Sequence, residues 1–270
     1  MLKNFTKLIT FKYKLSKNSC FEWSDDKLSL KNIRNFKILP SSLLLGIDNQ
    51  KEIILKNTKK FAEDYKSNNA LLWGTRGNGK STLIKSIFRE QSLIYKKLKL
   101  IQLKKNNLQN ILQLYEILDN FKSLRFIIFI DDLSFEKNSD EYNQIKSLID
   151  GNIIEQPNNI IIYATSNRRH LVSREMIENE KSSAIHTHES VEEKVSLSDR
   201  FGIWLGFHNI SQNDYINIIK SYGDFFKLNI SNKEINDSLI WSKTRGNMTG
   251  RTAWQYIIEL SANKKIHLDY

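Results

Sequence analysis

Between about residue 48 and residue 207, short apolar segments alternate with segments whose apolar residues recur every three or four positions. The short apolar segments have the length of buried strands and occupy residues 70–73, 98–103, 126–130, 160–164 and 203–207. The helical spacing covers residues 48–65, 83–88, 108–118 and 142–149. Because strands and helices alternate, the pattern predicts an α/β fold with a parallel sheet and helices on both of its faces.

This pattern divides the chain into three predicted parts. Residues 1–40 mix short apolar and charged pieces, with five lysines and no acid among the first twenty residues, and are expected to form an N-terminal basic arm. Residues 41–208 form the α/β core. Helical spacing after Ser211 predicts a small helical lid over residues 209–270. A chain of 270 residues is long enough for such a core and an appendage.

The clearest chemical motif follows the first predicted core strand. Residues 74–81, Gly-Thr-Arg-Gly-Asn-Gly-Lys-Ser, satisfy the G-x-x-x-x-G-K-S pattern of a phosphate-binding loop between a strand and a helix. In such a loop the glycines let the backbone approach the phosphates, the lysine reaches the β- and γ-phosphates, and the serine hydroxyl ligates Mg²⁺. The alternative is a glycine-rich turn without a ligand. We expect the ATP-binding residues to be Gly74, Thr75, Arg76, Gly77, Asn78, Gly79, Lys80, Ser81 and Thr82, with Ser81 as a metal ligand.

Two carboxylates, Asp131 and Asp132, follow the apolar strand 126–130, at the end where a parallel sheet presents its ligand crevice. We expect Asp131 to hold Mg²⁺ through water. Hydrolysis needs a second group that orients or deprotonates the attacking water, and Asp132 is the nearest candidate. Glu136 is the alternative base, because an aspartate reaches one methylene less far. Alternatively, these acids only cap a helix that follows the strand.

Polar residues later in the chain are further candidates for catalysis. Asn167, after the strand 160–164, is placed to hold the attacking water, although Ser-Asn after a strand also forms ordinary turns. Arg200 precedes the last strand and is a candidate finger into a neighbouring subunit's nucleotide, with Arg168 and Arg169 as competitors. Arg251 opens a helix of the lid and is a candidate contact to the γ-phosphate of its own subunit. For each arginine the alternative is a surface position.

Charge and composition narrow the possible partners and compartment. The formal net charge of +11 permits an anionic partner such as nucleic acid, although the abundance of Lys, Asn and Ile equally fits an A/T-rich genome. One cysteine, Cys20, excludes a disulfide framework, so a reducing, cytoplasmic location is expected. The apolar runs are too short to cross a bilayer. His186 and His188 lie in an acid-rich stretch without a further metal-ligand pattern, which favours a solvated loop.

The order of motifs resembles the bacterial AAA+ P-loop ATPase family catalogued as domain of unknown function 815, over roughly residues 40–260. The resemblance is carried by residues 45–50, 73–81, 131–136, 163–171, 192–202 and 250–255. It implies an adenine pocket around Gly46 and Ile47, sensor-like roles for Asn167 and Arg251, a finger role for Arg200, and self-association. It implies no substrate. The Asp-Asp pair departs from the Asp-Glu of most AAA+ proteins and is similar to that of replication-initiator and helicase-loader relatives, which leaves the base open.

These observations support one leading hypothesis and two alternatives. The first is an oligomeric, Mg²⁺-dependent ATPase that moves its lid against its core and remodels an unidentified macromolecular partner. The second is a nucleotide-gated scaffold with negligible hydrolysis, because Asp132 is too short to act as the base. A GTPase or a small-molecule kinase is disfavoured by the lack of an Asn-Lys-x-Asp sequence and by the paired downstream arginines.

Overall fold

The computed structural model describes residues 2–25, 27–34, 38–104, 107–108, 111–133, 156–167 and 201–268. The expected helix at 142–149 lies outside these ranges. So do the candidate residues Glu136, Arg168, Arg169, His186, His188 and Arg200.

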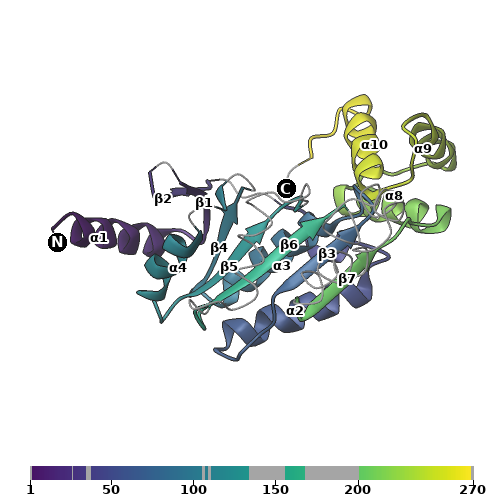
Figure 1. Cartoon of the computed structure of the whole chain (residues 1–270). Helices are drawn as coiled ribbons and strands as arrows, with labels where there is room; N and C mark the ends of the chain where they lie inside the picture. The colour runs from purple at the N-terminus through teal and green to yellow at the C-terminus, as the bar shows by residue number, and fades with distance from the viewer. Residues whose placement is uncertain are drawn as a thin grey trace, which may run out of the picture.

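A sheet of seven strands forms the centre of the described structure, in the order β2-β1-β4-β5-β6-β3-β7 (Figure 1). Its strands are β1 Cys20–Ser24, β2 Ser29–Asn32, β3 Ala70–Gly74, β4 Leu98–Leu103, β5 Arg125–Ile130, β6 Ile160–Ser166 and β7 Ile203–Phe207. Neighbouring strands run parallel, except that β1 and β2 form an antiparallel pair. Every residue of β6 is buried, as expected for a central strand covered on both faces.

The sheet extends into the segment that was predicted to be a basic arm. Cys20 of β1 lies beside Leu100 of β4, so β1 continues the parallel ladder. Phe21 and Trp23 are fully buried because they point into the core, and α1, Leu2–Lys17, adds Phe11 to the same cluster. The predicted boundary at residue 40 therefore does not mark the edge of the core.

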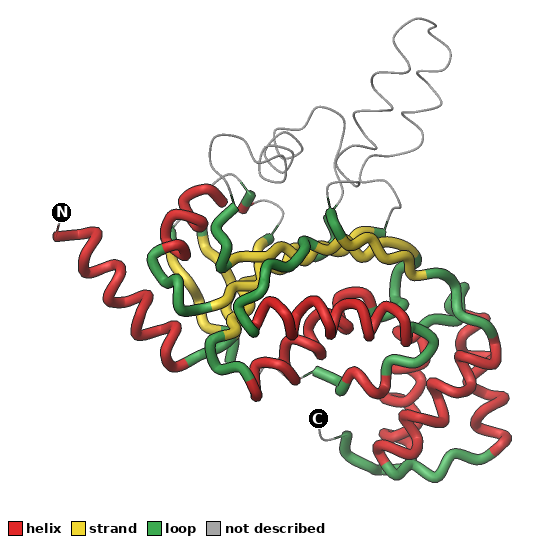
Figure 2. The backbone as a smooth tube through the Cα atoms, turned by 90° about the horizontal axis from the view of Figure 1, so that it is seen from below, coloured by secondary structure: helices red, strands yellow, loops and turns green. Residues whose placement is uncertain are grey.

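Helices cover both faces of the sheet, which gives the predicted three layers. On one face, α2 (Asp48–Ala62) and α3 (Lys80–Ile94) pack against each other and bury their apolar residues on the sheet (Figure 2). On the other face, α4 (Ile111–Asp119) buries Leu114 and Leu118 in the cluster that also contains Phe126 and Ile128 of β5. No helix among the described residues is long and apolar enough to cross a membrane.

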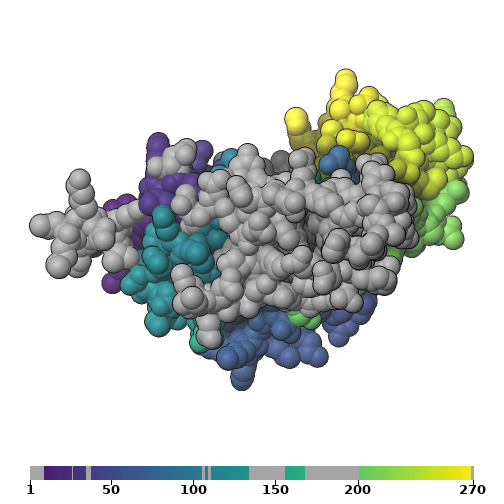
Figure 3. All heavy atoms as spheres, viewed as in Figure 1, coloured from purple at the N-terminus to yellow at the C-terminus, as the bar shows by residue number. Residues whose placement is uncertain are grey.

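Three helices, α8 Gln212–Phe226, α9 Asn232–Thr244 and α10 Gly250–Asn263, form a lid at one end of the core (Figure 3). Each begins at a capping box, in which a hydroxyl side chain and a polar residue three positions later satisfy backbone N–H groups. Tyr215, Ile219 and Ile257 form the lid's own core, and Leu39 and Leu43 from the segment before α2 join it. The lid thus packs on the chain that leads into the core.

Candidate nucleotide-binding site

The predicted phosphate loop connects the end of β3 to the start of α3. Gly79 is the N-cap residue of α3 and has a φ of 88°, in the left-handed region that favours glycine. The following N–H groups of the first helical turn have no partner within the helix and point toward the loop. The local structure is therefore the strand, loop and helix that an anion-binding helix N-terminus requires.

Glycine is required at the three glycine positions of the loop for different structural reasons. A Cβ on Gly74 would lie 2.1 Å from the carbonyl oxygen of Phe207 in β7, so this glycine is needed for strand packing. A Cβ on Gly77 would lie 3.1 Å from Oγ1 of Thr249, at the start of the lid helix α10. All three glycines have positive φ, and this is the only one of these requirements that applies to Gly79. Gly74 therefore has a steric requirement from β7 in addition to the close approach to ligand expected from the sequence.

Lys80 is an almost fully buried cation with only neutral hydrogen-bond acceptors. Its side chain is 5% exposed, and Nζ donates to the carbonyl oxygens of Gly74 at 2.8 Å and Thr75 at 2.9 Å and to Oδ1 of Asn167 at 3.2 Å. Burial lowers the pKa of Lys80 to about 8, against the opposing charges of Asp132 and Asp131. An anion bound beside Nζ would stabilise this ammonium group.

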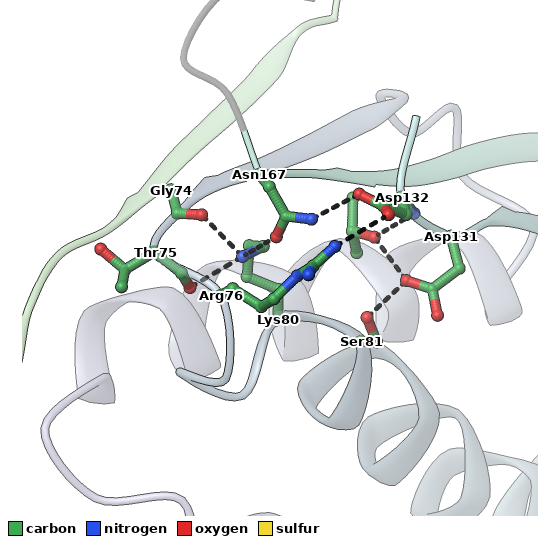
Figure 4. A network of polar contacts seen from close by, with 9 residues as sticks. Gly74, Thr75, Arg76, Lys80, Ser81, Asp131, Asp132 and Asn167 are labelled. Atoms are coloured by element: carbon green, nitrogen blue, oxygen red, sulfur yellow. Dashed lines mark hydrogen bonds and ion pairs between the residues drawn. The ribbon is translucent and has the colours of Figure 1, made fainter. Parts of the chain in front are cut away.

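Asp131 lies opposite the start of α3, at the carboxyl end of β5. Its Oδ1 accepts hydrogen bonds from the hydroxyls of Ser81 at 2.5 Å and Thr165 at 2.6 Å. These three residues come from α3, from the end of β5 and from β6, and the parallel sheet brings them together because the strands end at the same edge. They form a compact group of oxygen atoms next to Lys80 (Figure 4).

Asp132 is held in an uncommon backbone conformation, with a φ of 56°. Its N–H donates to Oγ1 of Thr165 at 3.0 Å, and its carboxylate accepts from Nδ2 of Asn167 at 2.5 Å. The guanidinium of Arg76 lies 3.7 Å from the same carboxylate. Asn167 therefore bridges Lys80 and Asp132, with its oxygen toward the cation and its nitrogen toward the anion (Figure 4).

A cavity of about 440 Å³ joins this polar group to an apolar space under the lid. Most of the predicted site residues line it: Ile47, Arg76, Gly77, Asn78, Gly79, Lys80, Ser81, Thr82, Asp131, Asp132, Asn167 and Arg251. Gly46, Gly74 and Thr75 do not, although Gly74 and Thr75 hold Lys80. The cavity size and its mixture of apolar walls and convergent polar groups are those of a small-molecule site.

Several lining residues were not predicted from the sequence. Thr165 was passed over in favour of Asn167, although a hydroxyl residue at the end of an apolar strand was a usable signal. The apolar wall includes Leu39, Ile210, Tyr222 and Trp254, which come from the segment before α2, the connection between β7 and α8, and two lid helices. Nothing in their local patterns distinguishes them from ordinary core residues.

The donor set fits a nucleotide with Mg²⁺. Mg²⁺ is commonly held by one or two protein oxygen ligands, with substrate phosphates and water completing its coordination. Ser81 and Asp131 supply such oxygens, and the described residues contain no cluster of three His, Cys, Asp or Glu side chains that would form a site for a metal on its own. Lys80, Arg76 and Arg251 would supply positive charge to phosphates, and the apolar wall would cover a base.

A comparison with family models identifies the family of the chain. Residues 16–264 match the family described as Protein of unknown function (DUF815). The chain belongs to this family. No curated protein matches the sequence significantly.

Solved structures share the fold at low sequence identity. A RuvB mutant of Thermotoga maritima is 17% identical with a TM-score of 0.57, over 86% of this chain and 68% of that chain. The Aeropyrum pernix ORC1 protein in complex with DNA is 13% identical with a TM-score of 0.54, over 87% and 67%. The Aeropyrum pernix ORC2 protein, in ADPNP-ADP complexes, is 12% identical with a TM-score of 0.54, over 82% and 64%. The predicted fold, a mainly parallel sheet with helices on both faces and a small helical lid, is confirmed.

Proposed function

We propose that this DUF815 protein is a Mg²⁺-dependent ATPase that works as an oligomer and remodels a macromolecular partner through movement of its lid. The observation that carries the proposal is the buried ammonium of Lys80, which has only neutral acceptors at the phosphate-loop end of the cavity. Burial disfavours this charged group even though Asp131 and Asp132 oppose that effect, and a bound phosphate would favour the charged form further.

The roles of the remaining groups follow from their positions. Ser81 and Asp131 would hold Mg²⁺, which when bound would neutralise charge on the phosphates. Asn167 bonds to both Lys80 and Asp132, and Asn167 together with Asp132 would orient the attacking water. Arg251, at the start of α10, would contact the phosphates from the lid. Glu136 and Arg200 keep their proposed roles as alternative base and trans-acting finger, although both lie outside the described residues.

A nucleotide-gated scaffold is the second candidate function, and the contacts of Asp132 favour it. The carboxylate accepts from Asn167 and lies 3.7 Å from the guanidinium of Arg76, and both contacts stabilise its charged form and weaken it as a base toward water. If these contacts persist with nucleotide bound, the protein would bind ATP and hydrolyse it very slowly.

Net charge and one structural neighbour support nucleic acid as the partner. The net charge of +11 favours an anionic partner such as nucleic acid. Contacts to phosphates would make such binding weaken steeply as the salt concentration rises. The ORC1 structure that shares the fold is a complex with DNA, which makes DNA a reasonable first probe. Binding of labelled duplex and single-stranded DNA over a range of salt concentrations tests this part of the proposal.

The deciding experiment measures Mg²⁺-dependent ADP binding and phosphate release from ATP over a range of protein concentrations. Lys80→Ala should abolish phosphate release and weaken ADP binding by about ten- to a hundredfold, whereas the control Lys96→Ala, at an exposed lysine outside the cavity, should change neither. Asp132→Asn and Glu136→Gln identify the base, because only one of them should stop turnover. Arg200→Ala should remove any rise of specific activity with concentration. Wild-type protein that binds no nucleotide would refute the proposal. Nucleotide binding without phosphate release would refute the ATPase and support the nucleotide-gated scaffold.

A further inference from the structure

The phosphate loop is hydrogen-bonded to the last residue of β7 and to the two residues that follow it. The N–H of Thr75 donates to the carbonyl oxygen of Phe207 at 2.8 Å, and the Thr75 hydroxyl donates to Oδ1 of Asn209 at 2.9 Å. Nδ2 of Asn78 donates to the carbonyl oxygen of His208 at 2.6 Å. Three successive residues, 207–209, thus contact the loop through three hydrogen bonds, which together we call the clamp.

The clamp lies at the connection between core and lid. Ile210, the next residue, lines the cavity, and Ser211 is the N-cap of the first lid helix, α8. The loop also contacts the other end of the lid, because the N–H of Arg251 in α10 donates to the carbonyl oxygen of Gly77 at 3.0 Å. The phosphate loop therefore forms hydrogen bonds at two places: with the segment that leads from the core into the lid, and with the start of the last lid helix.

The clamp acts on the same residues that hold Lys80. The carbonyl oxygen of Thr75 accepts from Lys80 Nζ at 2.9 Å, while the N–H and the hydroxyl of Thr75 are both used by the clamp. Asn78 is 6% exposed, and its amide nitrogen is fixed on His208. A displacement of residues 207–209 would therefore move the backbone that positions the ammonium group.

We propose that Asn209 is a positioning residue for phosphate binding and that the clamp couples the shape of the loop to the position of the lid. The proposal rests on the proposed nucleotide-binding function. Asn209 itself is exposed and does not line the cavity, so it acts through Thr75. Phosphate binding at the loop and packing of α8 against the core are then coupled. A change in either one alters the other by the same free energy.

The first arm of the test needs no nucleotide. Hydrogen exchange of the loop amides, residues 77–81, is compared in the full chain for wild type, Asn209→Ala and Asn209→Asp, with Asn213→Ala as the control for an exposed amide in the first turn of α8. Asn209→Ala should speed exchange of these amides by about twofold to tenfold, the usual range for one net hydrogen bond. Asn209→Asp keeps the acceptor for the Thr75 hydroxyl and should restore the wild-type rate.

The second arm adds ADP and measures its affinity together with exchange in α8. In wild type, ADP should slow exchange at the start of α8. In Asn209→Ala, ADP should bind about twofold to tenfold more weakly and slow α8 exchange less, and Asn209→Asp should recover both. Thr75→Val should have the same effect. Combining it with Asn209→Ala should add little, because the two substitutions remove the same hydrogen bond.

The outcomes separate the clamp from the proposed function. Unchanged loop exchange in Asn209→Ala overturns the clamp whether or not ADP binds. Loss of protection that Asn209→Asp does not restore, with a matching fall in Tm, shows a merely structural role and also overturns it. If the loop loosens as expected but wild type binds no ADP, the proposed function fails while the contact between clamp and loop stands.

Discussion

Substitution of Gly74 by alanine should destabilise the protein far more than alanine at another glycine with positive φ. Gly74 has a φ of 123°, and a Cβ there would lie 2.1 Å from the oxygen and 2.9 Å from the carbon and nitrogen of Phe207. These are backbone atoms of a paired strand, so they cannot move aside like the end of a flexible side chain. Gly246 has a φ of 87°, but a Cβ there meets nothing within 4 Å.

The difference between the two variants isolates the steric effect. A side chain in the glycine-only region costs about 1–3 kcal/mol, and separating β3 from β7 adds the loss of the Thr75–Phe207 hydrogen bond, about 1 kcal/mol. We expect Gly74→Ala to lose about 2–4 kcal/mol of unfolding free energy and Gly246→Ala about 1 kcal/mol. Urea unfolding monitored by far-UV circular dichroism measures both. Equal losses in the two variants would refute the conclusion that Gly74 is required by β7.

Four further predictions concern the site and the core. Lys80→Ala should weaken ADP binding by about ten- to a hundredfold, through loss of a charge-assisted hydrogen bond, as measured by isothermal titration calorimetry. Asp131→Asn should make ADP affinity nearly independent of Mg²⁺, and a retained response to EDTA would contradict its role as a metal-holding group. Burial raises the pKa of Tyr163 to about 12. The stability that this phenol confers is therefore complete below about pH 10 and is lost as the pH rises from about 10 to 12. Tyr163→Phe should lose less unfolding free energy than wild type over this pH range. Burial also raises the pKa of Cys20 to about 12, so its thiol should not react with Ellman's reagent at pH 8 until the protein unfolds.

Much of the fold could be predicted from local pattern. The strand and helix positions from α2 to β7 follow from apolar segments of strand length and from helical spacing, and the structure confirms them where it describes them. Residues 20–32 are not predicted as strands because polar residues interrupt the apolar ones in β1 and β2, whereas β3 and β7 are almost continuously apolar segments. The position of β1 in the sheet also depends on its pairing with β4, about eighty residues further along the chain.

The sequence by itself determined the phosphate-loop motif, the carboxylates after β5 and the order of strands and helices, because each depends on residues close together in the chain. Only the tertiary structure decided which residues share the cavity. β6 pairs with β5, which places Thr165 beside Asp131, and β7 pairs with β3, which places Phe207 against Gly74. Sheet neighbours are chosen by hydrogen bonding and packing between distant segments, and no local pattern records that choice. The contact between residues 207–209 and the phosphate loop belongs to this second kind, since it exists only once β7 has paired with β3.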